Sequence, residues 1–471
     1  MCLSHCWGTT RPLLTTSATL EQHKSGIPFD IIPKTFQDAI KFTARLGIRY
    51  IWIDTLCIVQ DDKEDWRRES ALMADIYRNA IITLAASAAT GSSDGLYNSS
   101  DPVYLSQELS LLHDRADHQG IYVRKNLKHF RRDLALLSRG WVFQERLLSP
   151  RVLHFGHLEL LWECMEQNNC ECSGMQGVLT LWFSAKKFYC GALLDIFPPR
   201  RLANIWRKVV QDYSQMNLTQ GKDIFPAISG AAKTMQAAIK SRYIAGLWEH
   251  NIIEDLMWST GEPERVKRPF EWRSPTFSWA STTSETSDRG IQYRLMDIMT
   301  ELLGLVPDPQ NANRERVYAK LVEANCTLAG PDRTGELISG YITLEGPLIR
   351  GLVKEAKDSF SSLPYEIYFP GQSKLPNRNN PDRIFPDYNW VSKGDNEVKP
   401  GSTVFCLKLV SIKAISRQRQ YLIGLIVRRV NDADKVYERI GLLKYMEGLE
   451  PDIETWFETA DMEDNAVVKI I

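Results

Sequence analysis

The first ninety residues alternate compact apolar runs with amphipathic segments. Three runs have little polar alternation, as is typical of strands covered on both faces: residues 1–7, 49–53 and 81–86. Between them, apolar residues three or four positions apart predict one helix that begins at Pro33 and ends near Gly47. A second helix is predicted after Asp61 and Asp62, which can cap its first turn. This order predicts a parallel sheet with right-handed crossovers.

The pattern changes further along the chain. Residues 139–164 predict a short helix, a break at Pro150 and a strand, and residues 200–260 are helical and rich in Trp. Beyond residue 270, alternating or apolar runs bounded by Gly and Pro predict antiparallel strands. We therefore expect an α/β domain, a Trp-rich helical region that packs on it, and a β-rich C-terminal domain, over residues 1–170, 171–270 and 271–471.

The length and the tryptophan content bear on how these parts are built. A chain of 471 residues exceeds one ordinary core and favours two or three domains. Its 13 Trp are more than such a chain usually carries. They can fill a heavy core or line an apolar cavity, and the core is the preferred interpretation.

Charge and hydropathy exclude two kinds of partner. With 57 basic and 58 acidic residues, the chain lacks the positive field that binds a phosphate backbone, so we expect no nucleic acid. No apolar stretch reaches the ~18 residues of a membrane span, so we expect no membrane either. Without a charged-then-apolar leader, the chain is predicted to be cytoplasmic, with its nine Cys as free thiols.

A candidate site follows from the predicted sheet. In open parallel sheets, ligands lie beyond the carboxyl ends of the strands. Here those ends bring Trp7 and Thr9, then Asp54 and Cys57, then Ser87 to one edge. Asp54 can orient a ligand hydroxyl or base, or it can cap the turn that follows its strand.

The sequence lacks the common signatures of cofactor and metal sites. It has no Walker A loop, no GxGxxG after the first strand, no HExxH and no GxSxG, so we expect no tightly bound cofactor. His154, His157, Cys164, Cys170 and Cys172 suggest zinc. Their spacing matches no tight structural-zinc pattern, because only one residue separates the last two cysteines. We therefore expect no metal.

Four blocks of residues resemble one known family. They are LSHCWG at 3–8, the run from PKTFQDAI to MADIYRNA at 33–80, RGWVFQERLLSPRVLHFG at 139–156 with WEC at 162–164, and a downstream set (YS at 213, ISG at 228, YIAGLW at 243, FSWAS at 277). Together they resemble the fungal heterokaryon-incompatibility (HET) family over roughly residues 1–300. The family usually has residues ahead of the first block, so we expect either a truncated gene model or a shortened first strand.

The resemblance implies a role in nonself recognition and regulated fungal cell death, with the HET domain as effector. HET domains distantly resemble TIR domains, which implies a flavodoxin/TIR-like parallel sheet with helical insertions. Some TIR domains cleave NAD with a Glu on the helix after the second strand, and that helix carries Glu69 here. A carboxylate there would stabilise positive charge on the ribose. The alternative is an ordinary helix Glu paired with a nearby Arg.

Other residues complete the candidate set. Trp141, Gln144 and Glu145 form a polar and aromatic block that returns to the sheet, either as pocket residues or as a buried hydrogen-bond network. Cys57 lies near the same edge, but a nucleophilic Cys needs a base. His5 is adjacent to Cys6 and therefore points to the opposite face of a strand from it, which disfavours cysteine catalysis.

Three functions remain open at this point. The first is a HET effector of cell death, with a TIR-like, NAD-directed activity. The second is a HET-like scaffold used as a cofactor-free cyclase or pericyclase in secondary metabolism, because such chemistry needs mainly a shaped apolar pocket. The third is a non-catalytic interaction module. The partner is thus a small-molecule ligand or a protein, and the oligomeric state stays open.

Overall fold

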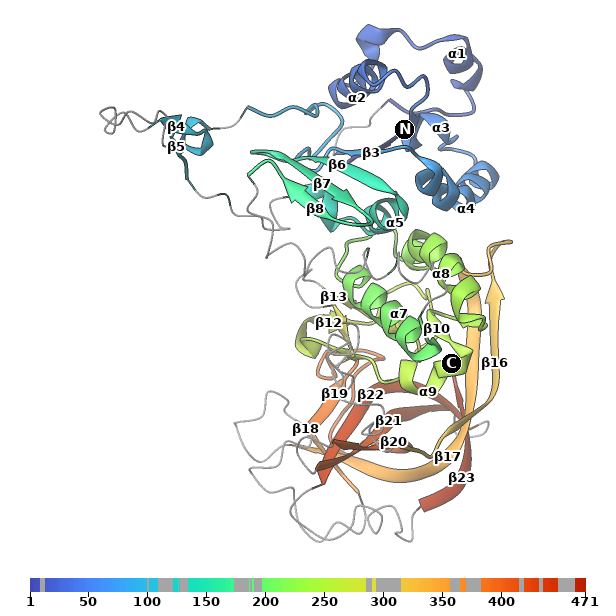
Figure 1. Cartoon of the computed structure of the whole chain (residues 1–471). Coiled ribbons are helices and arrows are strands. Elements are labelled where there is room, and N and C mark those ends of the chain that lie inside the picture. The colour runs from blue at the N-terminus through green and yellow to red at the C-terminus, as the bar shows by residue number, and fades with distance from the viewer. Residues whose placement is uncertain are drawn as a thin grey trace, which may run out of the picture. The chain divides into compact units, whose positions relative to one another are not determined.

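The computed structural model shows that the chain forms two compact units (Figure 1). Unit 1 comprises Met1–Asp195, Met216–Leu218 and Ala227–Ala231, and unit 2 comprises Ile196–Gln215, Thr219–Pro226 and Ala232–Ile471. The described residues are 1–8, 13–99, 101–108, 122–125, 127, 134–172, 186, 189, 197–284, 290–293, 315–355, 365–369, 383–414, 419–431, 435–447 and 462–471.

Unit 1 is built on a six-stranded mixed sheet. Its strands are β1 (Cys2–Ser4), β2 (Trp52–Ile53), β3 (Thr83–Ala85), β6 (Arg151–Phe155), β7 (Leu160–Cys164) and β8 (Asn168–Cys170). The order is β2-β1-β3-β6-β7-β8. The first four strands pair in parallel and the last two antiparallel. The predicted parallel sheet is confirmed for the N-terminal part, and a hairpin extends it.

The helices of unit 1 begin and end where their local chemistry requires. They are α1 (Leu20–Ser25), α2 (Lys34–Arg45), α3 (Asp54–Cys57), α4 (Lys63–Asn79) and α5 (Gly140–Leu148), with 3-10 turns η1 (Phe29–Ile31), η2 (Pro102–Tyr104) and η5 (Ala135–Ser138) and a small ladder of β4 (Gln107–Glu108) and β5 (Tyr122–Val123). The Asp62 carboxylate accepts from two backbone amides of α4 at 2.9 and 3.2 Å. Gly47 has a φ of 70°, the left-handed conformation that ends α2.

Alternate residues of the strands face two layers of helices. Leu3 and Leu84 pair in register and pack against Phe36 of α2. The next residue along β3, Ala85, faces the opposite side and packs with Val142 of α5. Both faces of the sheet centre are therefore covered, and the core of unit 1 lies on either side of β1 and β3.

The prediction that residues 49–53 form a strand buried on both faces is wrong. Only Trp52 and Ile53 of the run 49–53 pair with a neighbour, and Tyr50 is 76% exposed. The reason is the strand order, because β2 is an edge strand with a single neighbour. Ile81 is likewise exposed ahead of β3.

Unit 2 begins with a mainly helical region whose tryptophans, on helices, a strand and a loop, fill its core. Its helical elements are α7 (Pro199–Tyr213), α8 (Pro226–Ile239) and α9 (Ile252–Asp255), with turns η6 (Gly221–Ile224), η7 (Glu249–Asn251), η8 (Pro263–Arg265) and η9 (Trp279–Ser281). Residues Ala227–Ala231 of α8 belong to unit 1. Four tryptophans are almost fully buried: Trp206, Trp248, Trp258 and Trp279. The interpretation of these tryptophans as core residues is confirmed.

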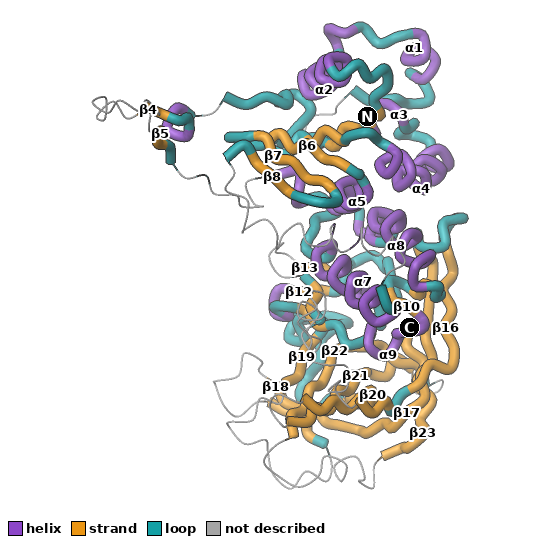
Figure 2. Tube along the Cα trace, in the orientation of Figure 1, coloured by secondary structure: helices purple, strands orange, loops and turns teal. Residues whose placement is uncertain are grey.

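Strands dominate the rest of unit 2 (Figure 2). The large sheet contains β15 (Glu315–Val317), β16 (Lys320–Leu328), β17 (Leu337–Glu355), β18 (Tyr365–Tyr368), β19 (Arg383–Pro386), β20 (Thr403–Ala414), β21 (Arg419–Asn431), β22 (Val436–Glu447) and β23 (Met462–Ile470). Short ladders join β9 (Tyr243–Ile244) to β10 (Leu247–Trp248), β11 (Ser259–Thr260) to β14 (Ile291–Gln292), and β12 (Val266–Lys267) to β13 (Thr283–Ser284). The predicted β-rich C-terminal region is confirmed.

The long strand β17 closes the large sheet on itself. It pairs with β23 along its first part and with β20 further on, while β20, β21, β22 and β23 pair in succession. All of these pairings are antiparallel except the short parallel pairing of β22 with β23. The pairing of β22 with β23 covers only two residue pairs, so most of the second edge of β23 is not paired within the described strands.

Two arginines are buried in unit 2 together with carboxylates. Arg439 Nε lies 3.0 Å from Asp387 Oδ2, and both side chains are fully buried. Its other nitrogens donate to the carbonyl oxygens of Leu256 and Trp258 at 2.7 and 2.6 Å. Arg207 forms a similar buried ion pair with Asp255, in which Nη2 lies 2.8 Å from Oδ1. These charges are fixed in place and fully hydrogen-bonded.

Among the described helices, none combines the length and the apolar character needed to cross a membrane.

Candidate functional site

The strand order of unit 1 defines a switch point at its carboxyl edge. From β1 the chain goes to β2 on one side and then to β3 on the other. Ligands of open α/β sheets lie where the strand order reverses in this way. Three segments follow the strands at this edge, and we call them the rim: His5–Gly8, Asp54 and Ser87.

Asp54 is the centre of the rim. Its Oδ2 accepts a hydrogen bond from Trp7 Nε1 at 2.9 Å, and its Oδ1 accepts from the Thr55 amide at 2.7 Å. His5 Nδ1 lies 3.6 Å from the same carboxylate. The Asp54 side chain is 21% exposed, whereas that of His5 is 1% exposed. Asp54 is therefore held as the first residue of α3, whose N-cap is Ile53, and presents charge to solvent at the sheet edge.

The imidazole of His5 is neutral near pH 7. Burial lowers the His5 pKa, and the charge of Arg139 adds to this effect, while Asp54 acts in the opposite direction. Within the part of the chain that the structure describes, neither ring nitrogen has a hydrogen-bond partner that meets the usual geometry. Phe36 packs edge-on against the ring at 4.8 Å. A buried polar ring with unused hydrogen-bonding capacity lies directly behind the Asp54 carboxylate.

Two glycines bring the loops after β1 and β3 into contact. Gly8 has a φ of 80°, and a Cβ added there would lie 3.0 Å from the Cα of Gly91. The second loop is held by the Asp94 carboxylate, which accepts from the amides of Thr90 and Gly91 at 2.8 and 3.1 Å. The position of Trp7 in the rim therefore depends on glycine at position 8.

Glu145 lies buried behind the rim. Burial raises its pKa to about 7, and the charge of Asp54 adds to this effect, while Ser4, Arg139 and Tyr77 act in the opposite direction. Among the described residues, its Oε2 has no hydrogen-bond partner. A carboxyl group in this environment carries its proton at or just below neutral pH, unlike the neighbouring, partly exposed Asp54.

Cys57 lies within electrostatic reach of two carboxylates, Asp54 and Glu69. Desolvation by neighbouring atoms raises the pKa of the thiol, although the residue as a whole is exposed, and the charges of Asp54 and Glu69 raise it further. The thiol is therefore protonated at neutral pH, which does not favour a nucleophile. The Glu69 side chain is 22% exposed and lies 3.6 Å from Arg68 Nε. This contact is the ion pair that the alternative interpretation of Glu69 predicts.

The remaining candidates contribute to helix packing or are not described. Trp141 packs edge-on against Trp66 at 6.1 Å. Gln144 Oε1 accepts from the Gly230 amide at 3.1 Å. These two residues connect α5 with α4 and with the start of α8. Thr9 lies outside the described residues.

No role was predicted for Arg139, which the structure places beside the rim. Arg139 Nη1 donates to the carbonyl oxygen of His5 at 2.6 Å. Its charge also lowers the pKa of Glu145. Arg139 is the first residue of the block at 139–156 that resembles the HET family. That resemblance was the sequence feature that could have pointed to it.

A second missed feature is a buried chain of polar groups behind β3. Ser87 Oγ lies 2.8 Å from His154 Nδ1, and His154 Nε2 lies 3.2 Å from Glu163 Oε2. Arg146 Nε donates to the same oxygen at 2.6 Å. Burial alone would raise the Glu163 pKa, but Arg146 and Lys186 lower it to about 2. Ser87, His154 and Glu163 are at most 1% exposed, so these groups connect the segment after β3 with β6 and β7 rather than facing a ligand.

Unit 2 contains a separate pocket of about 300 Å³, lined in part by Arg242, Tyr243, Cys326 and Arg333. Arg242 is paired with Glu249 at 2.9 Å. Burial raises the pKa of the Cys326 thiol to about 11, so it is protonated near neutral pH. The pocket is suited to binding more than to nucleophilic chemistry.

Comparison with known proteins gives one result. No curated protein and no solved structure matches the chain. Residues 1–145 match the family described as heterokaryon incompatibility protein (HET). This segment contains β1, β2, β3, most of α5 and all the rim residues. The N-terminal part of this chain is therefore similar to the HET family over these 145 residues.

Proposed function

We propose that this protein is an effector of fungal nonself recognition, in which the rim of the HET domain triggers cell death. The observation that carries the proposal is the location of the rim. All of its residues fall within the 145 residues that match the HET family. Inside that segment, the partly exposed Asp54 carboxylate is held by Trp7 at the switch point of the sheet.

The test is inducible expression in a filamentous fungus, with colony formation as the readout. Wild-type protein is expected to stop growth. Asp54→Asn removes the rim charge but keeps the size of the side chain, and it is expected to restore growth. The matched control is Asp75→Asn, because Asp75 is an exposed carboxylate of α4 paired with Arg78. Normal growth at high levels of intact wild-type protein would refute the proposal, as would equal killing by wild type and Asp54→Asn.

A more specific activity for the same site is hydrolysis of NAD. The strand order β2-β1-β3 supports this extension, because flavodoxin-like parallel sheets begin in that order. Asp54 and Glu69 are both partly exposed, and the negative charge of each raises the pKa of the Cys57 thiol. In the reaction, the nicotinamide–ribose bond breaks, nicotinamide leaves with the electron pair, and water supplies a hydroxyl to the sugar and a proton to solution. The Glu69 carboxylate, with Asp54 of the rim, would stabilise the positive charge that develops on the ribose.

The direct assay is nicotinamide release from NAD by the purified full-length chain. Wild type is expected to release nicotinamide, Glu69→Gln and Asp54→Asn are expected to lose this activity, and Glu64→Gln serves as the exposed control on the same helix. Absence of release by wild type would remove the NAD hydrolysis step but leave the effector proposal to the growth test.

A further inference from the structure

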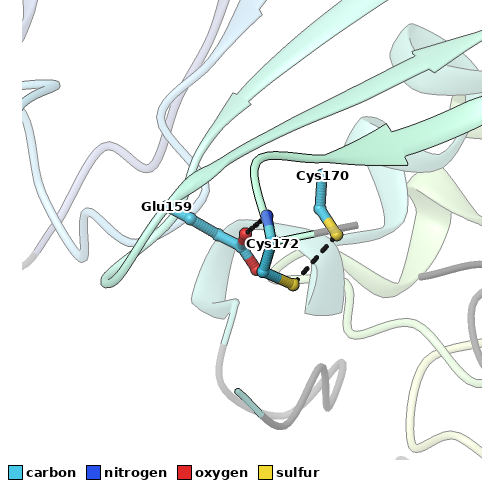
Figure 3. A group of neighbouring side chains, drawn as sticks. All are labelled: Glu159, Cys170 and Cys172. Carbon is cyan, nitrogen blue, oxygen red and sulfur yellow. Dashed lines mark hydrogen bonds between the residues drawn. The ribbon is translucent and has the colours of Figure 1, made fainter. Parts of the chain in front are cut away.

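Three potential metal-binding side chains meet at the far edge of the unit 1 sheet. Glu159 lies at the end of the turn between β6 and β7, Cys170 is the last residue of β8, and Cys172 follows two positions later (Figure 3). A carboxylate oxygen and the two Sγ atoms all lie within 4.8 Å of one another, and all three residues are half-buried. The site is therefore accessible to an ion but protected on one side.

The backbone holds the three side chains in place. Cys170 pairs with Leu161 on the neighbouring strand, two residues from Glu159. The Cys172 amide donates to Glu159 Oε2 at 2.7 Å, and the Leu160 amide donates to Glu171 Oε2 at 2.9 Å. These bonds connect the β6–β7 turn to the end of β8 from both sides. Little rearrangement is needed to bring the ligand atoms together.

The two thiols converge. Cys170 ends β8 and Cys172 lies in the turn that follows it, and their Sγ atoms lie 3.1 Å apart. Figure 3 shows both sulfur atoms and the Glu159 carboxylate on one side of the strand end. Ligands bonded to Zn²⁺ at ~2.0–2.3 Å in a tetrahedron lie roughly 3.5–3.8 Å apart. The observed spacing needs only small side-chain adjustments to reach this geometry.

The donor set selects the metal. Mg²⁺ and Ca²⁺ take oxygen ligands, and Cu⁺ favours sulfur alone. Zn²⁺ accepts thiolates and a carboxylate in one site. We propose that Glu159, Cys170 and Cys172 bind one Zn²⁺ ion, with water or an incoming ligand in the fourth position. The ion would tie the β6–β7 turn to β8, the edge strand of the sheet.

The site differs from the set of residues that the sequence suggested. His154 is hydrogen-bonded on both ring nitrogens, to Ser87 and Glu163, and so does not serve as a ligand. Cys164 Sγ accepts from the Gln167 amide at 3.4 Å and is not part of the cluster. The third ligand is Glu159, which spacing rules for Cys and His do not consider. The expectation of no metal was based on the Cys and His residues alone.

The experiment is a zinc titration of the full-length chain, reduced and stripped with a chelator, in competition with a chromophoric chelator. One Zn²⁺ per chain is expected, with release of up to two protons from the thiols, so the affinity rises with pH. Cobalt substitution should give the absorption of a tetrahedral thiolate site. Cys170→Ser and Cys172→Ser should abolish binding, and Glu159→Gln should weaken it at least about tenfold.

The matched control is Cys164→Ser, which changes a half-buried thiol of the same hairpin outside the cluster and should retain one Zn²⁺. Circular dichroism of each variant shows whether the fold persists. The proposal is overturned if the reduced wild type does not compete with the chelator, or if folded Cys170→Ser binds zinc as the wild type does. Unchanged affinity in Glu159→Gln also overturns it, because the site as proposed includes the carboxylate.

Discussion

The two units bury ionisable groups in opposite ways. In unit 2, Arg439 and Asp387 are fully buried partners, and further backbone carbonyl oxygens accept from the guanidinium. In unit 1, Asp54 is partly exposed, while burial leaves Glu145 with an unused oxygen and a pKa of about 7. The first arrangement fixes charges to hold a structure, and the second leaves groups that change protonation near neutral pH. Chemistry is therefore to be sought in unit 1.

The largest expected effect tests the structural role of charge in unit 2. Arg439→Met leaves the buried Asp387 carboxylate without its partner, which costs roughly 3–5 kcal/mol of stability. Hydrogen exchange measured peptide by peptide should show loss of protection in β19 and β22. Peptides from β1 and β3 should be unaffected if the units are energetically independent.

A double variant supplies the control. Arg439→Met combined with Asp387→Leu removes both charges, so much of the lost stability should return. If the double variant is as unstable as the single one, the cost comes from lost packing on Trp258, which the guanidinium covers at 3.5 Å, and not from the unpaired charge.

The next effect tests whether unit 1 responds to pH. The Glu145 pKa rises from an ordinary value of 4.5 to about 7 on folding, so the folded state binds its proton more tightly than the unfolded state. Its contribution to stability is full below pH 4.5 and is lost as the pH rises to about 7. Glu145→Gln should remove this loss and stabilise unit 1 by about 3 kcal/mol at pH 8.

Urea unfolding of unit 1 at a series of pH values measures this effect. Glu64→Gln is the control, because Glu64 is exposed and lies on the same unit. A wild-type pH profile that matches that of Glu145→Gln between pH 5 and 8 would contradict the raised pKa and would remove the contrast with unit 2.

A smaller effect concerns the geometry of the rim. Gly8→Ala places a Cβ 3.0 Å from the Gly91 Cα at a φ of 80°. Gly47→Ala also has a positive φ, 70°, but meets no atom within 4 Å. The conformational cost alone is roughly 1–2 kcal/mol, so Gly8→Ala should destabilise more than Gly47→Ala in thermal unfolding. Equal effects would show that the loops after β1 and β3 are not in contact.

The smallest effect isolates the hydrogen bond between Trp7 and Asp54. Trp7→Phe keeps an aromatic ring but loses the donor that lies 2.9 Å from the carboxylate. Because Asp54 is partly exposed, water can replace the donor, and the expected cost is about 1 kcal/mol. Trp141→Phe, which changes a ring in helix packing, is the comparison. A change in colony formation with Trp7→Phe and not with Trp141→Phe would place function at the rim.

Much of the architecture followed from periodicity and local chemistry. The alternation of apolar runs with helices predicted the parallel pairing of β1, β2 and β3, and Asp62 and Gly47 marked helix ends by the capping they provide. The exposed position of Tyr50 was not predicted, because strand order within a sheet is a tertiary property. A run of apolar residues looks the same at an edge and at the centre.

The candidate site was predicted only as a location. The ends of the strands gave Trp7 and Asp54 as neighbours, and the structure places them in hydrogen-bond contact. The pKa of Glu145 depends on its burial in the folded unit and could not be inferred from the block in which it occurs. Glu159 lies beside the two cysteines because of the register in which β7 and β8 pair. Spacing rules along a single segment do not describe such a contact.

The closure of the unit 2 sheet has a consequence for synthesis of the protein. β17 ends at Glu355, but its partner β23 begins only at Met462. On the ribosome, β17 therefore emerges well before the strand that completes its hydrogen bonding, whereas β1, β2 and β3 of unit 1 are already available. Unit 1 can fold while translation continues, and unit 2 must wait for β23. During that interval β17 can pair with β16, but the edge that later pairs with β23 stays open, and open strand edges favour misassociation of a nascent chain.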